Sequence, residues 1–191
     1  MSRTLKLAPL ALLCGLGMSA CGSARPTKRA IPAGYHRFDQ PVSAGVGFAL
    51  RVPAGFAADS PQITPEGWAS VTLGKPRGDD PVGLSANGAV LVNWSSAPGS
   101  VTLAQQVAET SAPAGNTNYR RSSQRVNIRG ASDARLVTQT YTDADGTPTT
   151  SRTLWVKSER GPLVGVLAVG PDRGALLDSA AVIRSFAWTA G

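Results

Sequence analysis

The chain carries few side chains that commonly act as nucleophiles, metal ligands or proton carriers at neutral pH. Its 191 residues include one histidine, His36, and two cysteines, Cys14 and Cys21. A serine–histidine–aspartate triad would have to use His36, and a zinc site of histidine and cysteine lacks the ligands that it needs. This inventory predicts that the chain holds no metal and no cofactor.

The paired carboxylates Asp143 and Asp145 are candidates for general acid–base chemistry. They stand directly before Gly146, and aspartate and glycine at this spacing are typical of a tight turn between strands. Nothing around them predicts the burial that would tune the pKa of one carboxyl group. We therefore predict a protein that is not an enzyme.

Arginines offer a candidate binding surface. Lysine and arginine total 19 against 12 aspartates and glutamates, which gives a net charge of +7. Arg121 and Arg125 share one side of a predicted strand, because side chains alternate along a strand, and Arg152 on a nearby predicted strand could join them. Such a patch would hold a carboxylate, a phosphate or an acidic partner. The alternative is that these charges only keep an edge strand from pairing with other chains.

The four tryptophans are a second candidate surface. A groove lined by them would suit a small apolar or lipid-like ligand, and in that case the protein is a carrier. The other interpretation places most of them in the hydrophobic core. They are Trp68, Trp94, Trp155 and Trp188.

Residues 1–20 are typical of a bacterial export signal. Arg3 and Lys6 precede an apolar run over residues 7–16, which is too short for a permanent membrane-spanning helix. An exported protein does not meet cellular nucleic acid, so the positive charge is interpreted as affinity for anionic envelope surfaces.

The residues before Cys21 resemble the lipobox of bacterial lipoproteins. Small residues lead to this cysteine, although Met18 stands where the lipobox prefers leucine. The resemblance implies cleavage after Ala20 and lipid attachment at Cys21, which would anchor the chain to the extracytoplasmic face of the cell membrane. The alternative is an ordinary signal peptide that is cut after Ala24.

Residues 21–37 are interpreted as the lipidated N-terminus and a flexible basic tether, because they lack apolar periodicity and contain two prolines. Each basic side chain near a membrane surface would gain about 1 kcal/mol from anionic head groups. The alternative is a solvated linker without a partner. His36 falls within this tether.

Residues 38–191 are expected to form a single α+β domain. Period-two alternation or turn signals predict strands, and two stretches with helical spacing predict helices. Helices segregated from antiparallel strands indicate an α+β fold. The predicted strands cover 48–52, 68–73, 90–94, 119–128, 134–142, 149–157 and 163–169; the helices cover 102–112 and a segment opened by Asp172, with Leu176, Leu177, Ala180 and Ile183 as its buried stripe.

Three stretches resemble the Mog1/PsbP-like fold, in this order: Gly47–Phe56, Arg129–Val137 and Ile183–Phe186. With the lipobox and the basic tether, the chain resembles the actinobacterial LpqN/LpqT-type lipoproteins. The resemblance implies an antiparallel sheet with two flanking helices. It also implies a role in the cell envelope as a binding protein for envelope lipids or other proteins, and it supplies no catalytic residue.

Overall fold

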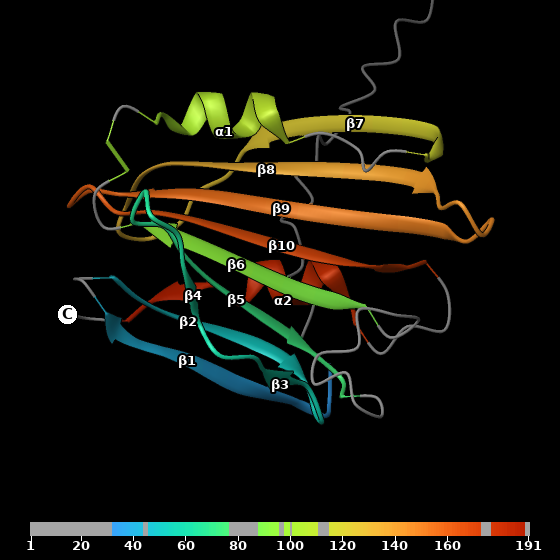
Figure 1. Ribbon diagram of the computed structural model, residues 1–191, viewed down its shortest axis with the longest axis horizontal. Coiled ribbons are helices and arrows are strands. Elements are labelled where there is room, and N and C mark those ends of the chain that lie inside the picture. The colour runs from blue at the N-terminus through green and yellow to red at the C-terminus, as the bar shows by residue number, and fades with distance from the viewer. Residues whose placement is uncertain are drawn as a thin grey trace, which may run out of the picture.

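The computed structural model describes residues 32–43, 46–76, 88–95, 98–99, 101–110, 115–172 and 177–189. Within them the strands form two sheets in which every pairing is antiparallel (Figure 1). The small sheet has the order β1 (Tyr35–Ser43), β2 (Val46–Pro53), β11 (Ala187–Trp188). The large sheet runs β3 (Ala57–Ala58), β5 (Ala69–Gly74), β6 (Ala89–Ser95), β10 (Leu163–Pro171), β9 (Pro148–Ser158), β8 (Ala131–Thr142), β7 (Thr117–Arg125), and β4 (Gln62–Ile63) also pairs with β5.

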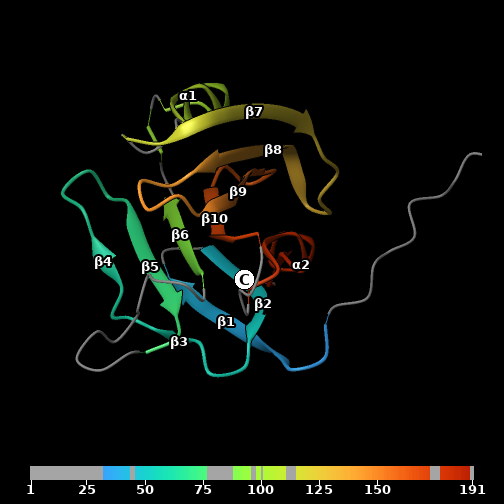
Figure 2. The same cartoon turned by 90° about the vertical axis from the view of Figure 1, so that its right-hand side faces the viewer.

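Two helices flank the large sheet on opposite sides. Helix α1 (Leu103–Glu109) packs on β8 and β9, whereas α2 (Ser179–Arg184) contacts β9, β10 and β2. Figure 2 shows α1 on one side of the large sheet, and α2 with the small sheet on the other. The predicted α+β arrangement of antiparallel strands and two helices is therefore present, together with a second small sheet that the sequence patterns did not predict.

The main hydrophobic core lies between the two sheets and α2. Alternation along β2 places Phe48, Leu50 and Val52 in it, each with no exposed surface. The ring of Phe48 meets Trp94 edge-on at 5.6 Å and stacks on Phe186 at 6.2 Å. Burying one such side chain stabilises the fold by about 1.5–3 kcal/mol, so this contact fixes how the small sheet sits on the large one.

Helix α1 covers a smaller cluster on the opposite face of the large sheet. Thr102 and Gln105 form a capping box, because each side chain accepts a hydrogen bond from the backbone N–H of the other. Leu103 then packs with Trp155 and Leu163. The helix ends at Glu109, before the predicted residue 112.

Strand β1 begins three residues before the predicted start of the domain at residue 38. Tyr35 pairs with Pro53, and His36 pairs with Val52. The predicted boundary is wrong because this end of the strand pairs with β2 through its backbone and packs Tyr35 against the main core, although His36 and Arg37 are exposed. His36 thus belongs to the folded domain and not to the tether.

Helix α2 begins later than predicted. Asp178, not Asp172, caps it, with Oδ1 accepting from the Ala181 N–H at 3.1 Å. Asp172 instead accepts a hydrogen bond from the Thr150 hydroxyl. In the predicted stripe, Leu177 and Ile183 are buried and Ala180 is half-buried.

The export signal, Cys21, the tether up to residue 31 and Leu176 lie outside the described residues. In the part of the chain that the structure describes, no helix has the length and apolar character to cross a membrane.

Candidate functional site

A cleft of about 830 Å³ opens at one end of the large sheet. Strands β8 and β9 are antiparallel neighbours, so the loop that leads into β8 and the turn that leaves β9 meet at this end. The Glu159 N–H donates to the Gly130 carbonyl at 3.3 Å and joins these two segments. The segment after α2 closes the third side; the walls are 127–130, 158–160, Pro162, Arg184, 186–189 and Gly47.

The walls of this cleft carry a surplus of positive charge. Arg129, Arg160 and Arg184 line it together with a single carboxylate, Glu159, which leaves a net charge of +2. Arg184 has only a long contact of 4.0 Å to Asp178. The exposed side chains of Arg129 and Arg160 make no hydrogen bond or ion pair with any described residue. Both guanidinium groups are therefore available to an anion.

Trp188 borders the cleft with part of its side chain, while its indole N–H is buried. Its Nε1 is buried and has no hydrogen-bond partner among the described residues. Leaving such a donor unsatisfied costs about 1–3 kcal/mol. The ring meets Phe186 edge-on at 5.3 Å, and the N–H edge lies against Gly130, where an added Cβ would stand 3.2 Å from Cδ1. The ring is thus held in a fixed place beside the cleft, with its N–H covered.

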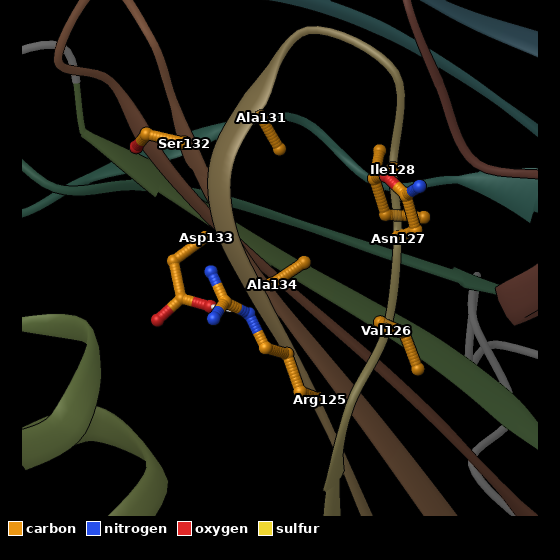
Figure 3. Close-up of a pocket in the computed structure, with 8 residues that line it drawn as sticks. All are labelled: Arg125, Val126, Asn127, Ile128, Ala131, Ser132, Asp133 and Ala134. Atoms are coloured by element: carbon orange, nitrogen blue, oxygen red, sulfur yellow. Dashed lines mark ion pairs between the residues drawn. The ribbon is translucent and has the colours of Figure 1, made fainter.

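A second hollow of about 420 Å³ adjoins the cleft and shares Asn127 and Ile128 with it. Figure 3 shows Ala131 and Ala134 pointing into this loop, while the Arg125 guanidinium turns to Asp133. Arg125 Nε lies 3.2 Å from one Asp133 oxygen, and Arg135 Nε lies 3.5 Å from the other. Because Arg125 forms an ion pair with this carboxylate, its guanidinium group is less available to a ligand than those of Arg129 and Arg160.

The structure places Arg152 apart from Arg121 and Arg125, and it gives each of the three arginines a partner within the protein. Arg121 donates to the Val107 carbonyl of α1, and Arg125 pairs with Asp133. Arg152 donates to Ser179 at the start of α2, on the opposite face of the large sheet. The prediction that Arg152 joins the other two is wrong. Arg121 is in register with Gln139 of β8 and, through it, with Ser151 of β9. Arg152 is the next residue after Ser151, and side chains alternate along a strand, so Arg152 points to the opposite face.

The tryptophans do not line one common groove. Trp94 lies in the main core, and Trp68 packs with Trp155 under α1. Trp155 donates to the Thr110 hydroxyl at 3.0 Å. Only Trp188, of these four, borders the cleft.

Asp143 and Asp145 stabilise the turn in which they lie. Asp143 accepts from the Thr149 hydroxyl at 2.5 Å, and Asp145 accepts from the Thr147 N–H at 2.9 Å. That backbone hydrogen bond is the main cause that lowers the pKa of Asp145. Among the described residues, no group of three or more histidines, cysteines, aspartates and glutamates is placed to hold a metal ion.

Sequence reasoning did not single out Arg160 or Arg184. One signal was present in the sequence, since Arg129 and Arg160 each precede a glycine, which is typical of a turn. In the structure both glycines have a positive φ, 80° at Gly130 and 106° at Gly161. Arg129 lies just before β8 and Arg160 just after β9. Because these two strands are antiparallel neighbours, the start of one and the end of the other lie at the same end of the sheet.

Comparisons with known proteins give a likeness among solved structures. No protein-family model matches the sequence, and no curated protein matches it. Among solved structures, the chain is similar to the solution structure of cyanobacterial PsbP (CyanoP) from Synechocystis sp. PCC 6803, with 13% identity and a TM-score of 0.49. The match covers 90% of this chain and 99% of that chain. A similarity of this extent supports no statement about ligand or partner.

Proposed function

We propose that this chain is an exported, lipid-anchored protein of the cell envelope whose domain binds an anionic ligand or partner and catalyses no reaction. The observation that carries the binding role is the cleft, where the exposed guanidinium groups of Arg129 and Arg160 have no partner among the described residues. A guanidinium group binds oxyanions with paired N–H donors, which suits a carboxylate or phosphate.

The anchor is supported by the sequence alone. The apolar run over 7–16 and the small residues before Cys21 support export and lipid attachment, as in the LpqN/LpqT-type lipoproteins that the chain resembles. We therefore place the protein at the extracytoplasmic face of the cell membrane, with an envelope lipid or protein as its partner.

Anchoring is tested by comparing the wild-type chain with Cys21→Ser in an actinobacterial host. The wild-type chain should partition into the detergent phase and the variant into the aqueous phase, because the thiol that carries the lipid is gone. Equal partitioning of both into the aqueous phase would show that the chain is not lipidated.

Binding is tested with polyphosphate as a soluble anionic probe and two double variants of equal charge. Arg129→Ala with Arg160→Ala removes two charges from the cleft. Arg51→Ala with Arg120→Ala removes two exposed charges that line neither hollow. We expect the cleft variant to bind at least about tenfold more weakly than the control variant, and the affinity of the wild type to fall with salt.

Equal losses in the two variants would assign binding to net charge and not to the cleft. Binding of an apolar probe that ignores both salt and the arginines would favour the alternative function, a carrier of a small apolar or lipid-like ligand.

A further inference from the structure

Strand β1 forms an open edge of the small sheet. Among the described strands only β2 pairs with it, and β2 lies between β1 and β11 (Figure 1). A long strand whose backbone is unpaired on one side is a template for another strand. We propose that β1 pairs antiparallel with β1 of a second copy of this chain, about a two-fold axis at Phe38, so that Arg37 of each copy stands opposite Asp39 of the other.

The backbone groups of Arg37 and Asp39 point to the open side of β1. Arg51 of β2 is in register with Arg37, and its N–H donates to the Ser185 hydroxyl at 2.7 Å and not to β1. Arg37 and Arg51 therefore form a pair without mutual backbone hydrogen bonds, in which both backbones face away from each other. The direction alternates along a strand, so Asp39 faces the open side as Arg37 does.

Opposite charges at these two positions make β1 complementary to itself. Arg37 and Asp39 lie on one face of the strand and form an ion pair of 2.7 Å, yet their side chains stay 56% and 53% exposed, so both can contact a second copy. A two-fold axis at Phe38 would bring the two ion pairs together as four alternating charges. Opposite charges directly across two strands stabilise the pairing, and like charges destabilise it. An axis at either charged residue would set that residue against its own copy, so charge selects the register.

Phe38 adds an apolar contact at the centre of the pairing. Its side chain is half-buried and packs against the main core. Across the axis the two Phe38 residues would form a pair without mutual backbone hydrogen bonds, the type in which opposite side chains come closest. Aromatic side chains directly across two strands stabilise their pairing, so this contact supports the same register as the charges.

The long edge of the large sheet does not suit a second copy. Strand β7 ends that sheet, and all nine of its residues are exposed. It carries Arg120, Arg121 and Arg125 but no carboxylate, so pairing with another β7 would bring positive charges together. Such a pattern protects an edge from pairing. Of these two long edges, β1 alone has a self-complementary charge pattern.

A dimer through β1 would leave the cleft of each copy open. The cleft is lined by residues of β11, which pairs with β2 on the side away from β1. A two-fold interface uses the same patch on both copies, so the assembly closes at two. The dimer would present two clefts, and a failure of this inference leaves the proposed function unaffected.

Sedimentation velocity of the mature chain tests the pairing, with Cys21→Ser to remove the lipid. We expect the chain to dimerise with a dissociation constant below about 1 mM. Arg37→Asp and Asp39→Arg each set like charges across the axis, so each should weaken dimerisation at least about tenfold. Arg120→Asp on β7 changes the net charge as much as Arg37→Asp does and should leave the dissociation constant unchanged.

Two combinations should restore the dimer and show that the single variants still fold. The double variant Arg37→Asp with Asp39→Arg exchanges the charges and is again self-complementary. An equal mixture of the two single variants sets two aspartates of one copy against two arginines of the other, so it should form mixed dimers. Both should dimerise to within about threefold of the wild-type dissociation constant.

Amide hydrogen exchange reports the register. The N–H groups of Arg37 and Asp39 point to the open side, so their exchange should slow as the protein concentration rises and the dimer forms. The Phe38 N–H faces β2 by the same alternation and should exchange slowly at every concentration.

Three results would overturn this inference. The first is a wild-type chain that remains a monomer at about 1 mM. The second is a dimer that survives both single variants, or a mixture of them that dimerises no better than either alone, because the interface would then lie elsewhere. The third is a dimer in which exchange at Arg37 and Asp39 does not slow.

Discussion

The hydroxyl oxygen of Tyr35 accepts a hydrogen bond of 2.6 Å from the backbone N–H of Asp178. This bond ties the first strand to the residue that caps α2, although 143 positions separate the two in the sequence. Because Arg184 ends α2 and Trp188 follows shortly after, the bond also helps to place two walls of the cleft.

Removing this acceptor should weaken the fold. Tyr35→Phe keeps the ring and loses the hydroxyl, so we expect the free energy of unfolding to fall by about 0.5–1.5 kcal/mol. His36→Ala is the matched control, since its exposed side chain should change stability by no more than about 0.5 kcal/mol. Urea denaturation measures both, and an effect of His36→Ala as large as that of Tyr35→Phe would refute this account of β1.

Alkaline pH should destabilise the protein through two tyrosines. Burial is the main cause that raises the pKa of Tyr35 and of Tyr141 above 10.0, and the charge of Asp143 adds to the effect at Tyr141. The folded state therefore holds both phenol protons more tightly than the unfolded state. Their contribution to stability is complete below pH 10.0 and is lost as the pH rises through the raised values.

The check is the free energy of unfolding measured between pH 8 and pH 11, chosen to span the values near 10 that tyrosine ordinarily shows. The decline should be shallower in Tyr141→Phe. If this variant and the wild type decline in parallel, Tyr141 does not contribute.

Gly130 should matter for binding as well as for stability. Its φ is 80° and an added Cβ would press on Trp188, whereas Gly146 has a similar φ of 86° and open space around it. We expect Gly130→Ala and Gly146→Ala each to lose about 1 kcal/mol of stability from the backbone alone. Only Gly130→Ala should also weaken polyphosphate binding, by moving the indole. Equal binding in the two variants would show that the cleft wall formed by Gly130 and Trp188 does not take part in binding.

Gly165→Ala should destabilise the protein more than either turn variant. An added Cβ would lie 2.3 Å from the Trp155 ring, which must then move and disturb α1. Forcing extra volume into a packed site typically costs about 1–3 kcal/mol. Thermal unfolding measures the loss, and a melting temperature equal to that of the wild type would show that the ring has room to move.

Strands with alternating large apolar residues could be predicted from the sequence, whereas polar strands were placed less well. Phe48, Leu50 and Val52 alternate with less apolar neighbours and predict β2. Strand β1 (Tyr35–Ser43) was not predicted, because its residues carry no clear apolar alternation, although their backbone pairs with β2. Asp172 was predicted to open the last helix, whereas Asp178 caps it, and the sequence pattern alone did not show this later start.

The candidate site was harder to predict because no single segment contains it. Its walls come from segments near residues 47, 130, 160 and 188, which the pairing of β8 with β9 and of β2 with β11 brings together. The sequence correctly suggests that Arg121 and Arg125 share a face, as strand alternation requires. It does not show that Arg121 already donates to the Val107 carbonyl and that Arg125 already pairs with Asp133.

The contact of Trp155 with Gly165 makes the sizes of these two side chains depend on each other. The ring occupies the volume that any side chain at position 165 would need. A larger residue at 165 is therefore tolerated only where position 155 has already become smaller, and a smaller residue at 155 leaves a cavity under α1 unless 165 gains volume. Among homologous proteins, these two positions on adjacent strands should change as a pair, and each should stay fixed where the other does.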